Sequence, residues 1–131
     1  MIETALNAYL LGHTGVAAMV GTRIYPLQAP KGTATPYLVY LKVSSGRRYT
    51  HDGFANFQQP RMQISCYAER YLTSGSVVGV KNLAQEVIAA IEAWPGATNI
   101  QAAFLEDEKD LTDPDTKLFH IALDFFVDYG A

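Results

Sequence analysis

Residues 118–129 read LFHIALDFFVDY, and this stretch decides the fold because its side chains alternate in character along the chain. One face of the predicted strand is apolar and carries Phe119, Ile121, Leu123, Phe125, Val127 and Tyr129. The other face carries His120, Asp124 and Asp128. A period of two residues is typical of a β-strand, and an apolar face requires a covering layer. The sequence therefore predicts a sheet that is covered on one side.

The chain has the length and composition of one globular domain spanning residues 1–131. Hydrophobic residues make up 49% and charged residues 18%, which leaves open a modest domain with a sticky surface or a surface that a partner covers. The net charge of −3 argues against a general nucleic-acid binder. Residues 1–20 lack a basic segment and a continuous apolar run, so we expect neither a signal peptide nor a membrane span.

Cys66 is the single cysteine, which excludes an internal disulfide and agrees with folding in a reducing cytoplasm. It falls in a predicted strand, and no basic group is indicated nearby that would lower the pKa of its thiol. We therefore expect a buried and unreactive thiol.

Two helices are predicted at the start of the chain. Apolar residues at helical spacing predict a first helix from Ile2 to Gly12. Thr14 is a suitable N-cap for a second, short helix that runs through Val20 and ends at Gly21. Residues 23–25 read as a brief extended piece, and residues 28–36, rich in Pro, Gly and Thr, read as a loop.

Two strands and a long connection follow. Residues 37–43 combine aromatic and β-branched side chains, and residues 61–68 alternate between polar and apolar ones, so both segments are predicted to be strands. The 17 residues from Ser44 to Pro60 are too many for a tight turn. We interpret them as the extended tip of a hairpin.

The long helix of the domain is predicted from a broad apolar stripe between Val77 and Trp94. Thr73, Ser74 or Ser76 can cap its start, and Pro95-Gly96 follows its end.

A short strand over residues 100–105 is predicted to continue into an acidic turn from Glu106 to Asp115, which leads to the final strand. The order of elements predicts an α+β fold in two layers. A mainly antiparallel sheet of about four strands is expected to be covered by an N-terminal helix and one long helix, with a long hairpin loop.

The carboxylates around the acidic turn suggest a calcium or magnesium site, because hard cations take several oxygen ligands from one loop. The set comprises Glu106, Asp107, Glu108, Asp110, Asp113, Asp115 and Asp124. The spacing does not support this reading, because an EF-hand loop needs acids at alternate positions and Leu111, Thr112 and Pro114 interrupt the run. We expect no metal, and a solvated or partner-facing acidic surface instead.

No other pattern in the sequence indicates catalysis. His13, His51 and His120 share no ligand spacing with Cys66, which argues against a zinc site. The sequence contains no Gly-x-Ser-x-Gly elbow, no Gly-x-Gly-x-x-Gly loop and no Walker loop. We expect a protein that is not an enzyme and that uses no cofactor.

One basic and aromatic segment lies on the long connection and comprises Arg47, Arg48, Tyr49, His51, Phe54 and Phe57. Two interpretations remain open. The aromatic side chains pack back on the domain, or the segment is an interaction arm, since aromatic residues and arginine are enriched at interface hot spots.

Several segments, taken in order, carry a resemblance to a known family. They are the N-terminal amphipathic helix, Gly21-Thr22-Arg23-Ile24-Tyr25-Pro26, Thr35-Pro36-Tyr37-Leu38-Val39-Tyr40, the strand from Arg61 to Tyr67, and residues 104–129 with Asp113-Pro114-Asp115-Thr116-Lys117-Leu118-Phe119-His120. Together they cover nearly the whole chain. The sequence resembles the small tail completion, or tail terminator, proteins of long-tailed bacteriophages and prophages.

The resemblance implies a structural protein of the virion that is made in the bacterial host cytoplasm. It implies a homo-oligomer, expected to be a hexameric ring, that caps the head-proximal end of the tail tube, stops tube growth and joins tail to head. The implied partners are the tail tube protein and a stopper or connector protein of the head and neck, with no membrane and no specific nucleic acid.

Two surfaces fit that role. The segment that contains Arg47, Arg48 and Tyr49 suits an arm that contacts the next subunit of a ring. The acidic turn, or Asp124 and Asp128, suits the lining of a passage for DNA or a contact with basic groups of an adjacent subunit.

Two other functions remain open at the sequence level. One is a neck adaptor or stopper between the portal and the tail, which would share the size and acidity of the chain. The other, from a different class, is a small-molecule-binding α+β domain with its pocket between helix and sheet.

Overall fold

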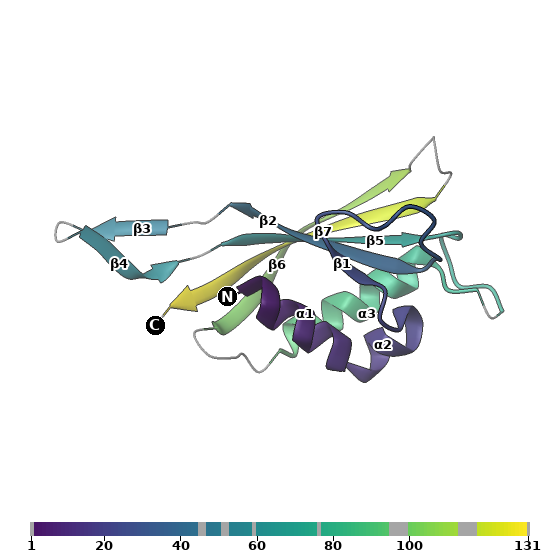
Figure 1. Cartoon of the computed structure of the whole chain (residues 1–131), viewed down its shortest axis with the longest axis horizontal. Helices are drawn as coiled ribbons and strands as arrows, with labels where there is room; N and C mark the ends of the chain where they lie inside the picture. Colours follow the sequence, from purple (N-terminus) through teal and green to yellow (C-terminus); the bar gives the residue numbers. More distant parts are fainter. Residues whose placement is uncertain are drawn as a thin grey trace.

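The computed structural model describes residues 2–44, 47–50, 53–58, 60–75, 77–94, 100–112 and 118–130. Within these ranges, three helices and seven strands follow one another along the chain: α1 (Ile2–Gly12), α2 (Thr14–Val20), β1 (Ile24–Pro26), β2 (Tyr37–Ser44), β3 (Arg47–Thr50), β4 (Gly53–Gln58), β5 (Arg61–Ala68), α3 (Val80–Glu92), β6 (Ile100–Thr112) and β7 (Phe119–Gly130). The helices lie on one face of the sheet (Figure 1). The predicted two-layer α+β class is therefore confirmed.

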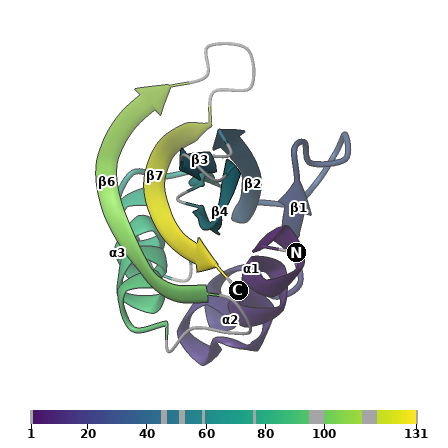
Figure 2. The ribbon, with the colours of Figure 1, turned by 90° about the vertical axis from the view of Figure 1, so that its left-hand side faces the viewer.

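The strands form one sheet in the order β1-β2-β5-β7-β4-β3, with β6 along the other edge of β7. Only β1 and β2 pair in parallel among the described strands, and the remaining pairs are antiparallel. Strands β5 and β4 lie end to end beside β7, because Arg61 faces Phe126 and Gln58 faces Tyr129 in the same register. The sheet curves around the helical layer when it is viewed from the end (Figure 2).

The core forms where β7 and β5 meet the helices. On β7, the side chains of Ile121, Leu123, Phe125 and Val127 are at most 2% exposed, as the alternation in the sequence predicts. The inward positions of β5 are equally buried and are Met62, Ile64, Cys66 and Ala68. Burial of these apolar surfaces supplies the main stabilisation of the two-layer fold.

The helical layer is held together by aromatic contacts as well as by its apolar stripe. Tyr9 of α1 stacks on Trp94, just beyond α3, with ring centroids 5.0 Å apart. The Tyr9 hydroxyl donates a hydrogen bond of 2.6 Å to the carbonyl oxygen of Ala90. The buried face of α3 is formed by Val80, Leu83, Ala84, Val87, Ala90 and Ile91. The contacts of Tyr9 with Trp94 and Ala90 fix α1 against α3 and close one end of the core.

The long connection between β2 and β5 contains two further strands, where the sequence predicted only an extended tip. Strand β3 pairs with β4, and both continue the hairpin formed by β2 and β5. The hairpin bends at two register shifts, between Lys42 and Ser44 and between Arg47 and Tyr49. Such shifts increase local twist, so the strand periodicity in the sequence is interrupted although pairing continues. Figure 1 shows this β3–β4 hairpin, hereafter the arm, projecting beyond the helical layer.

The acidic turn predicted from Glu106 to Asp115 is wrong in its first half. Strand β6 extends over 13 residues to Thr112, so Glu106 to Asp110 are strand residues. Strand β6 pairs with β7 down to the first residue of β7, where Thr112 faces Phe119. Because β6 is an edge strand, its backbone is fixed by β7 while charged side chains remain at the rim of the sheet. Asp113 and Asp115 lie outside the described residues.

Two helix starts also differ from the prediction. Helix α3 begins at Val80 with Gly79 as N-cap, and not after Thr73, Ser74 or Ser76. The backbone N–H groups of Val80 and Lys81 donate to the carbonyl oxygens of Arg70 and Tyr71, so the preceding chain replaces a capping side chain. Helix α2 is capped by His13, whose Nδ1 accepts a hydrogen bond of 3.3 Å from the backbone N–H of Val16.

Gly79 lies where no side chain fits. A Cβ atom at this position would come within 2.2 Å of the Leu72 carbonyl carbon and 2.3 Å of the Thr73 nitrogen. We predict that Gly79→Ala lowers the free energy of unfolding by about 1–3 kcal/mol, because the backbone must shift to admit a methyl group.

Gly12→Ala is the matched control, because a Cβ atom there has no neighbour within 4 Å. Its effect should stay within about 0.5 kcal/mol in urea unfolding measurements. Equal effects of the two substitutions would show that the crossing of residues 72–73 over Gly79 is not a close contact.

Candidate functional site

The arm brings together most residues of the basic and aromatic segment. Arg47, Arg48 and Tyr49 lie on β3, and Phe54 and Phe57 lie on β4. Tyr49 faces Phe54 across the hairpin. His51 lies outside the described residues. Five of the six residues in this segment therefore share one two-stranded projection.

The face of the sheet opposite the helices, hereafter the open face, carries a mixed set of polar, aromatic and charged side chains. By strand register and alternation it comprises Tyr37, Val39, Leu41, Arg61, Gln63, Ser65, Tyr67, Phe104, Glu106, Asp107, Lys109, Leu111, His120, Ala122, Asp124 and Phe126. Tyr67 stacks between Tyr37 and His120, at centroid distances of 4.9 and 4.3 Å. These stacked rings form a ladder across β2, β5 and β7.

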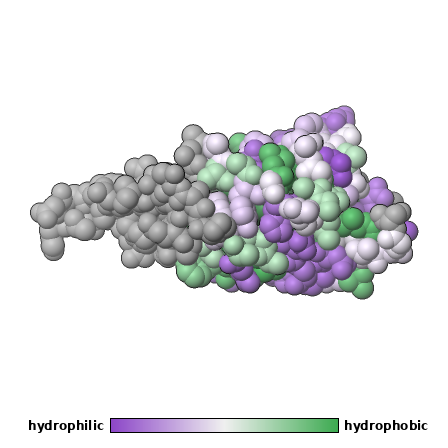
Figure 3. Space-filling view, turned by 90° about the horizontal axis from the view of Figure 1, so that it is seen from below, coloured by the Kyte–Doolittle hydropathy of each residue, from purple (hydrophilic) through white to green (hydrophobic). Residues whose placement is uncertain are grey.

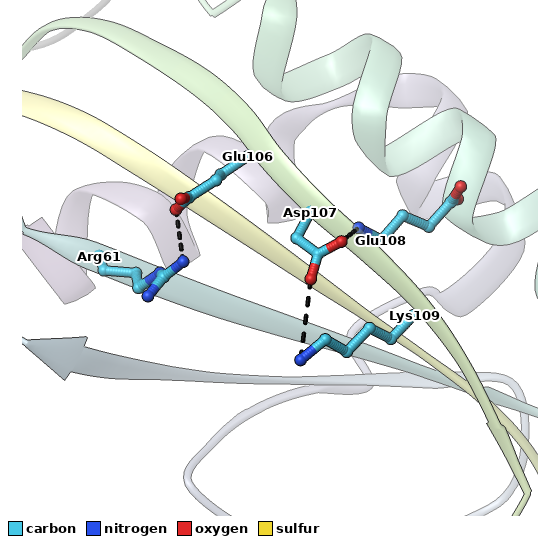
Figure 4. Close-up of polar contacts among 5 residues, drawn as sticks. All are labelled: Arg61, Glu106, Asp107, Glu108 and Lys109. Carbon is cyan, nitrogen blue, oxygen red and sulfur yellow. Dashed lines mark hydrogen bonds and ion pairs between the residues drawn. The ribbon is translucent and has the colours of Figure 1, made fainter.

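The carboxylates of β6 do not form one cluster. A register shift between Leu105 and Asp107 turns both Glu106 and Asp107 to the open face. Glu106 reaches across β7 and accepts a hydrogen bond of 2.5 Å from Arg61 on β5 (Figure 4). Asp107 lies 3.7 Å from the Nζ of Lys109. Figure 4 shows Glu108 pointing away from both pairs.

The next two carboxylates of β6 point to the helical side. Glu108 accepts a hydrogen bond of 3.4 Å from Lys81 of α3, and Asp110 accepts one of 2.8 Å from the Tyr71 hydroxyl. Burial alone would lower the pKa of Lys81. The attraction and hydrogen bond of the Glu108 carboxylate act in the opposite direction and are stronger, so the net pKa of Lys81 is raised. The hydrogen bond to Asp110 raises the pKa of the Tyr71 hydroxyl. Each β6 carboxylate is thus tied to a different part of the fold.

Asp124 differs from the carboxylates of β6. It lies half-buried near the middle of β7, opposite Gln63 and Asp107, and makes no hydrogen bond or ion pair with the described residues. Asp128 lies further along the same strand, opposite Ala102. Across the described part of the chain, no three His, Cys, Asp or Glu side chains lie close enough to share a metal ion.

Three surface residues were missed by the sequence reasoning. Arg61 was interpreted only as the start of a strand, but its guanidinium also lies 5.3 Å from the centre of the Phe126 ring. Phe104 and Leu111 are 53% and 47% exposed at the two ends of the charged part of β6. No two-residue alternation marks them in the sequence, because five charged residues run consecutively from Glu106 to Asp110 and a register shift interrupts the strand. The density of acids therefore suggested a turn.

The space between helices and sheet is filled by side chains. The apolar cavity there has a volume of about 10 Å³ and is lined by Leu6, Met62, Ile64, Ile91, Trp94, Ala103, Phe125 and Val127. A space of this size holds no more than about one water molecule. Figure 3 shows hydrophilic residues over much of the helical side, with hydrophobic ones in scattered spots. No helix within the described ranges is long and apolar enough to cross a membrane.

Cys66 is buried on β5, and burial raises the pKa of its thiol. We predict that native protein does not react with Ellman's reagent at neutral pH and releases one equivalent of chromophore only after denaturation, because the thiolate is the reacting species. Reaction of the folded protein at the rate of an exposed cysteine would contradict this placement.

The Arg61–Glu106 pair should contribute measurably to stability although its side chains are 34% and 38% exposed. We predict a coupling energy of up to about 1 kcal/mol in a double-mutant cycle of Arg61→Ala and Glu106→Ala. The Lys109–Asp107 pair is the control, since its side chains are 62% and 46% exposed. Its coupling in the same urea measurements should be close to zero. A coupling energy near zero in the Arg61–Glu106 cycle would mean that the contact across β7 adds nothing to stability.

Comparison with known proteins agrees with this architecture. The chain matches the family described as tail completion protein gp17 over residues 4–127. A chain in the solved structure "Virion of native gene transfer agent (GTA) particle" shares the fold with a TM-score of 0.72 and 18% sequence identity, covering 99% of this chain and 95% of that chain. No match was found among curated proteins. Since the family match extends over nearly all of the sequence, this chain belongs to the tail completion protein gp17 family.

Proposed function

We propose that the protein forms a ring on the head-proximal end of a phage tail tube, where it ends tube growth and joins the tail to the head. The observation that carries the proposal is the family match over residues 4–127. The match covers the helices, β2, the arm, β5, β6 and most of β7, so the whole fold takes part in the comparison.

The shape of the subunit supports a ring. The arm projects from the body at one place, and β6 forms an edge of the sheet at another. Two different surfaces on one subunit favour head-to-tail contacts, which close into a ring when the rotation between subunits permits. A hexamer is the ring that the family resemblance implies, and the virion at the junction of head and tail is its expected location.

The open face is the proposed lining of the passage. Its two basic residues, Arg61 and Lys109, each lie beside a carboxylate. The carboxylate of Asp124 has no basic side chain paired with it among the described residues. An uncompensated carboxylate repels DNA phosphates, so DNA can move through the ring without binding to its wall. Asp128, on the same strand, is proposed to act with Asp124.

The proposed role is structural, without a chemical step and without a cofactor. The filled core supports this view, because the cavity of about 10 Å³ between helices and sheet leaves no room for an organic ligand. A neck adaptor or stopper role at the portal side is the second candidate, because it requires the same size and the same kind of ring.

Electron microscopy of a tail assembly reaction tests the proposal. Purified protein added to polymerising tube protein should place a ring on one end of each tube and stop its elongation, so that tubes no longer lengthen with time. Binding to portal complexes with no effect on tubes would replace termination by the neck role. Absence from both structures would reject both functions.

Asp124→Lys tests the passage lining. We predict that rings and capped tubes still form, because the residue faces away from the helical core, and that the yield of infectious particles falls because DNA is retained by the added cation. Asp124→Asn is the matched control and should have a smaller effect. Full infectivity of Asp124→Lys would remove this residue from the passage.

A further inference from the structure

We propose that the arm strand β3 of one subunit adds to the outer edge of β6 in the next copy of this chain, so that the sheets of the ring become continuous. Arg47 and Arg48 of the arm then meet the carboxylates of β6. The inference rests on the proposed ring and deepens it, because it names the two surfaces that join one subunit to the next.

The unpaired edge of β6 is the first observation. Among the described strands, β6 pairs with β7 alone, and it does so over 13 residues. Its other side therefore presents a row of backbone N–H and C=O groups that no described strand uses. An open edge of this length is a template for an added strand, and main-chain hydrogen bonds would supply much of the affinity.

The opposite edge of the sheet is a poor template. Strand β1 has only three residues and ends at Pro26, which has no N–H to donate. The N–H group of Leu27, the next residue, is already bonded to the carbonyl oxygen of Tyr40 at 2.8 Å. The bond of Leu27 points inward to β2, so it is the short length of β1 and the missing N–H of Pro26 that make this outer edge a poorer template than β6.

Charge complementarity identifies the occupant. Strand β6 contains four carboxylates and Lys109, which gives −4 + 1 = −3. Strand β3 contains two arginines and no acid, which gives +2. The side chains of Glu106 and Asp107 remain 38% and 46% exposed beside their internal partners. A carboxylate accepts several hydrogen bonds, so arginines from a neighbour can bind without breaking the pairs inside the subunit.

Apolar contacts fit the same pairing. Phe104 and Leu111 flank the charged part of β6 and are 53% and 47% exposed. The arm carries Tyr49, Phe54 and Phe57 in its two strands. Exposed apolar side chains on an edge strand are an aggregation hazard unless a partner covers them, and aromatic residues of an added hairpin would cover them.

The arm has the reach for this contact. Four residues of β4, 53–56, lie beyond the pairing with β7, and at about 3.3 Å per residue they project roughly 13 Å. The pairing of β4 with β7 through Phe57 and Gln58 fixes its base. Edge-to-edge addition also places the helices of all subunits on the same side of the continuous sheet, and the open faces on the other.

Cysteine cross-linking of rings on tail tubes tests the pairing. The variant carries Thr50→Cys on β3 and Lys109→Cys on β6, and Cys66 stays protected because it is fully buried. A short bismaleimide should link neighbouring subunits and give a ladder of gel bands at multiples of the subunit mass. The largest band should have the mass of the complete ring. Thr50→Cys with Gln28→Cys, beside β1, is the control and should give no ladder.

The result also separates the inference from the proposed function. Rings on tubes with no ladder from the β6 pair, or with a ladder from the β1 pair, would overturn the strand addition and leave tail termination intact. Tubes without rings would overturn the function and the strand addition together. Microscopy reports whether rings form on tubes, and the gel reports whether neighbouring subunits are cross-linked.

A charge exchange tests the electrostatic part. Arg47→Glu with Arg48→Glu should abolish ring formation, and so should Glu106→Lys with Asp107→Lys, two carboxylates that remain exposed on β6. The chain that carries all four substitutions should recover rings, because the opposite charges again face one another. A fourfold variant as defective as either pair would overturn the proposed contact between the arginines and the carboxylates. Circular dichroism of each variant verifies that the subunit is folded.

Discussion

The structure depends on β7, whose backbone is paired along both edges. Strands β5 and β4 occupy one edge in a single register, and β6 occupies the other. The same strand buries Ile121, Leu123 and Phe125 against the helices. A strand that is fixed on both edges and on one face has no freedom to slip, because a shift of one residue would turn its apolar side chains to solvent. The positions of the arm base and of the β6 edge both follow from this constraint.

The sequence predicted an element correctly where its buried side chains recur at the regular period of a strand or a helix. Residues 121–127 of β7 and the inward positions of β5 follow a period of two, and α3 follows the helical period, so these elements were predicted correctly. Strands β3 and β4 were not predicted as strands, because two bulges break the alternation of the hairpin. The start of α3 was misplaced because its cap comes from the carbonyl groups of Arg70 and Tyr71, which have no side-chain signature.

The arrangement of the acidic residues could not be read from the sequence for a different reason. Two of them have partners that are distant along the chain, since Arg61 and Glu106 are 45 residues apart and Lys81 and Glu108 are 27 apart. One bulge in β6 decides which carboxylates face the open side, and no local pattern records it. A run of acids with a proline after it is typical of a turn, and only the paired edge of β7 makes it a strand.

A charged edge strand has two effects that are usually considered separately. Carboxylates along β6 discourage pairing with another acidic or neutral edge, which protects the free subunit from indiscriminate addition. The same carboxylates favour a strand that carries arginine, and the chain supplies such a strand in its own arm. A short strand on a charged edge gives a weak contact between two subunits. In the proposed ring every such contact would close at once, and a tube end would hold the subunits at high local concentration, so assembly would depend on the template and not on the subunits alone.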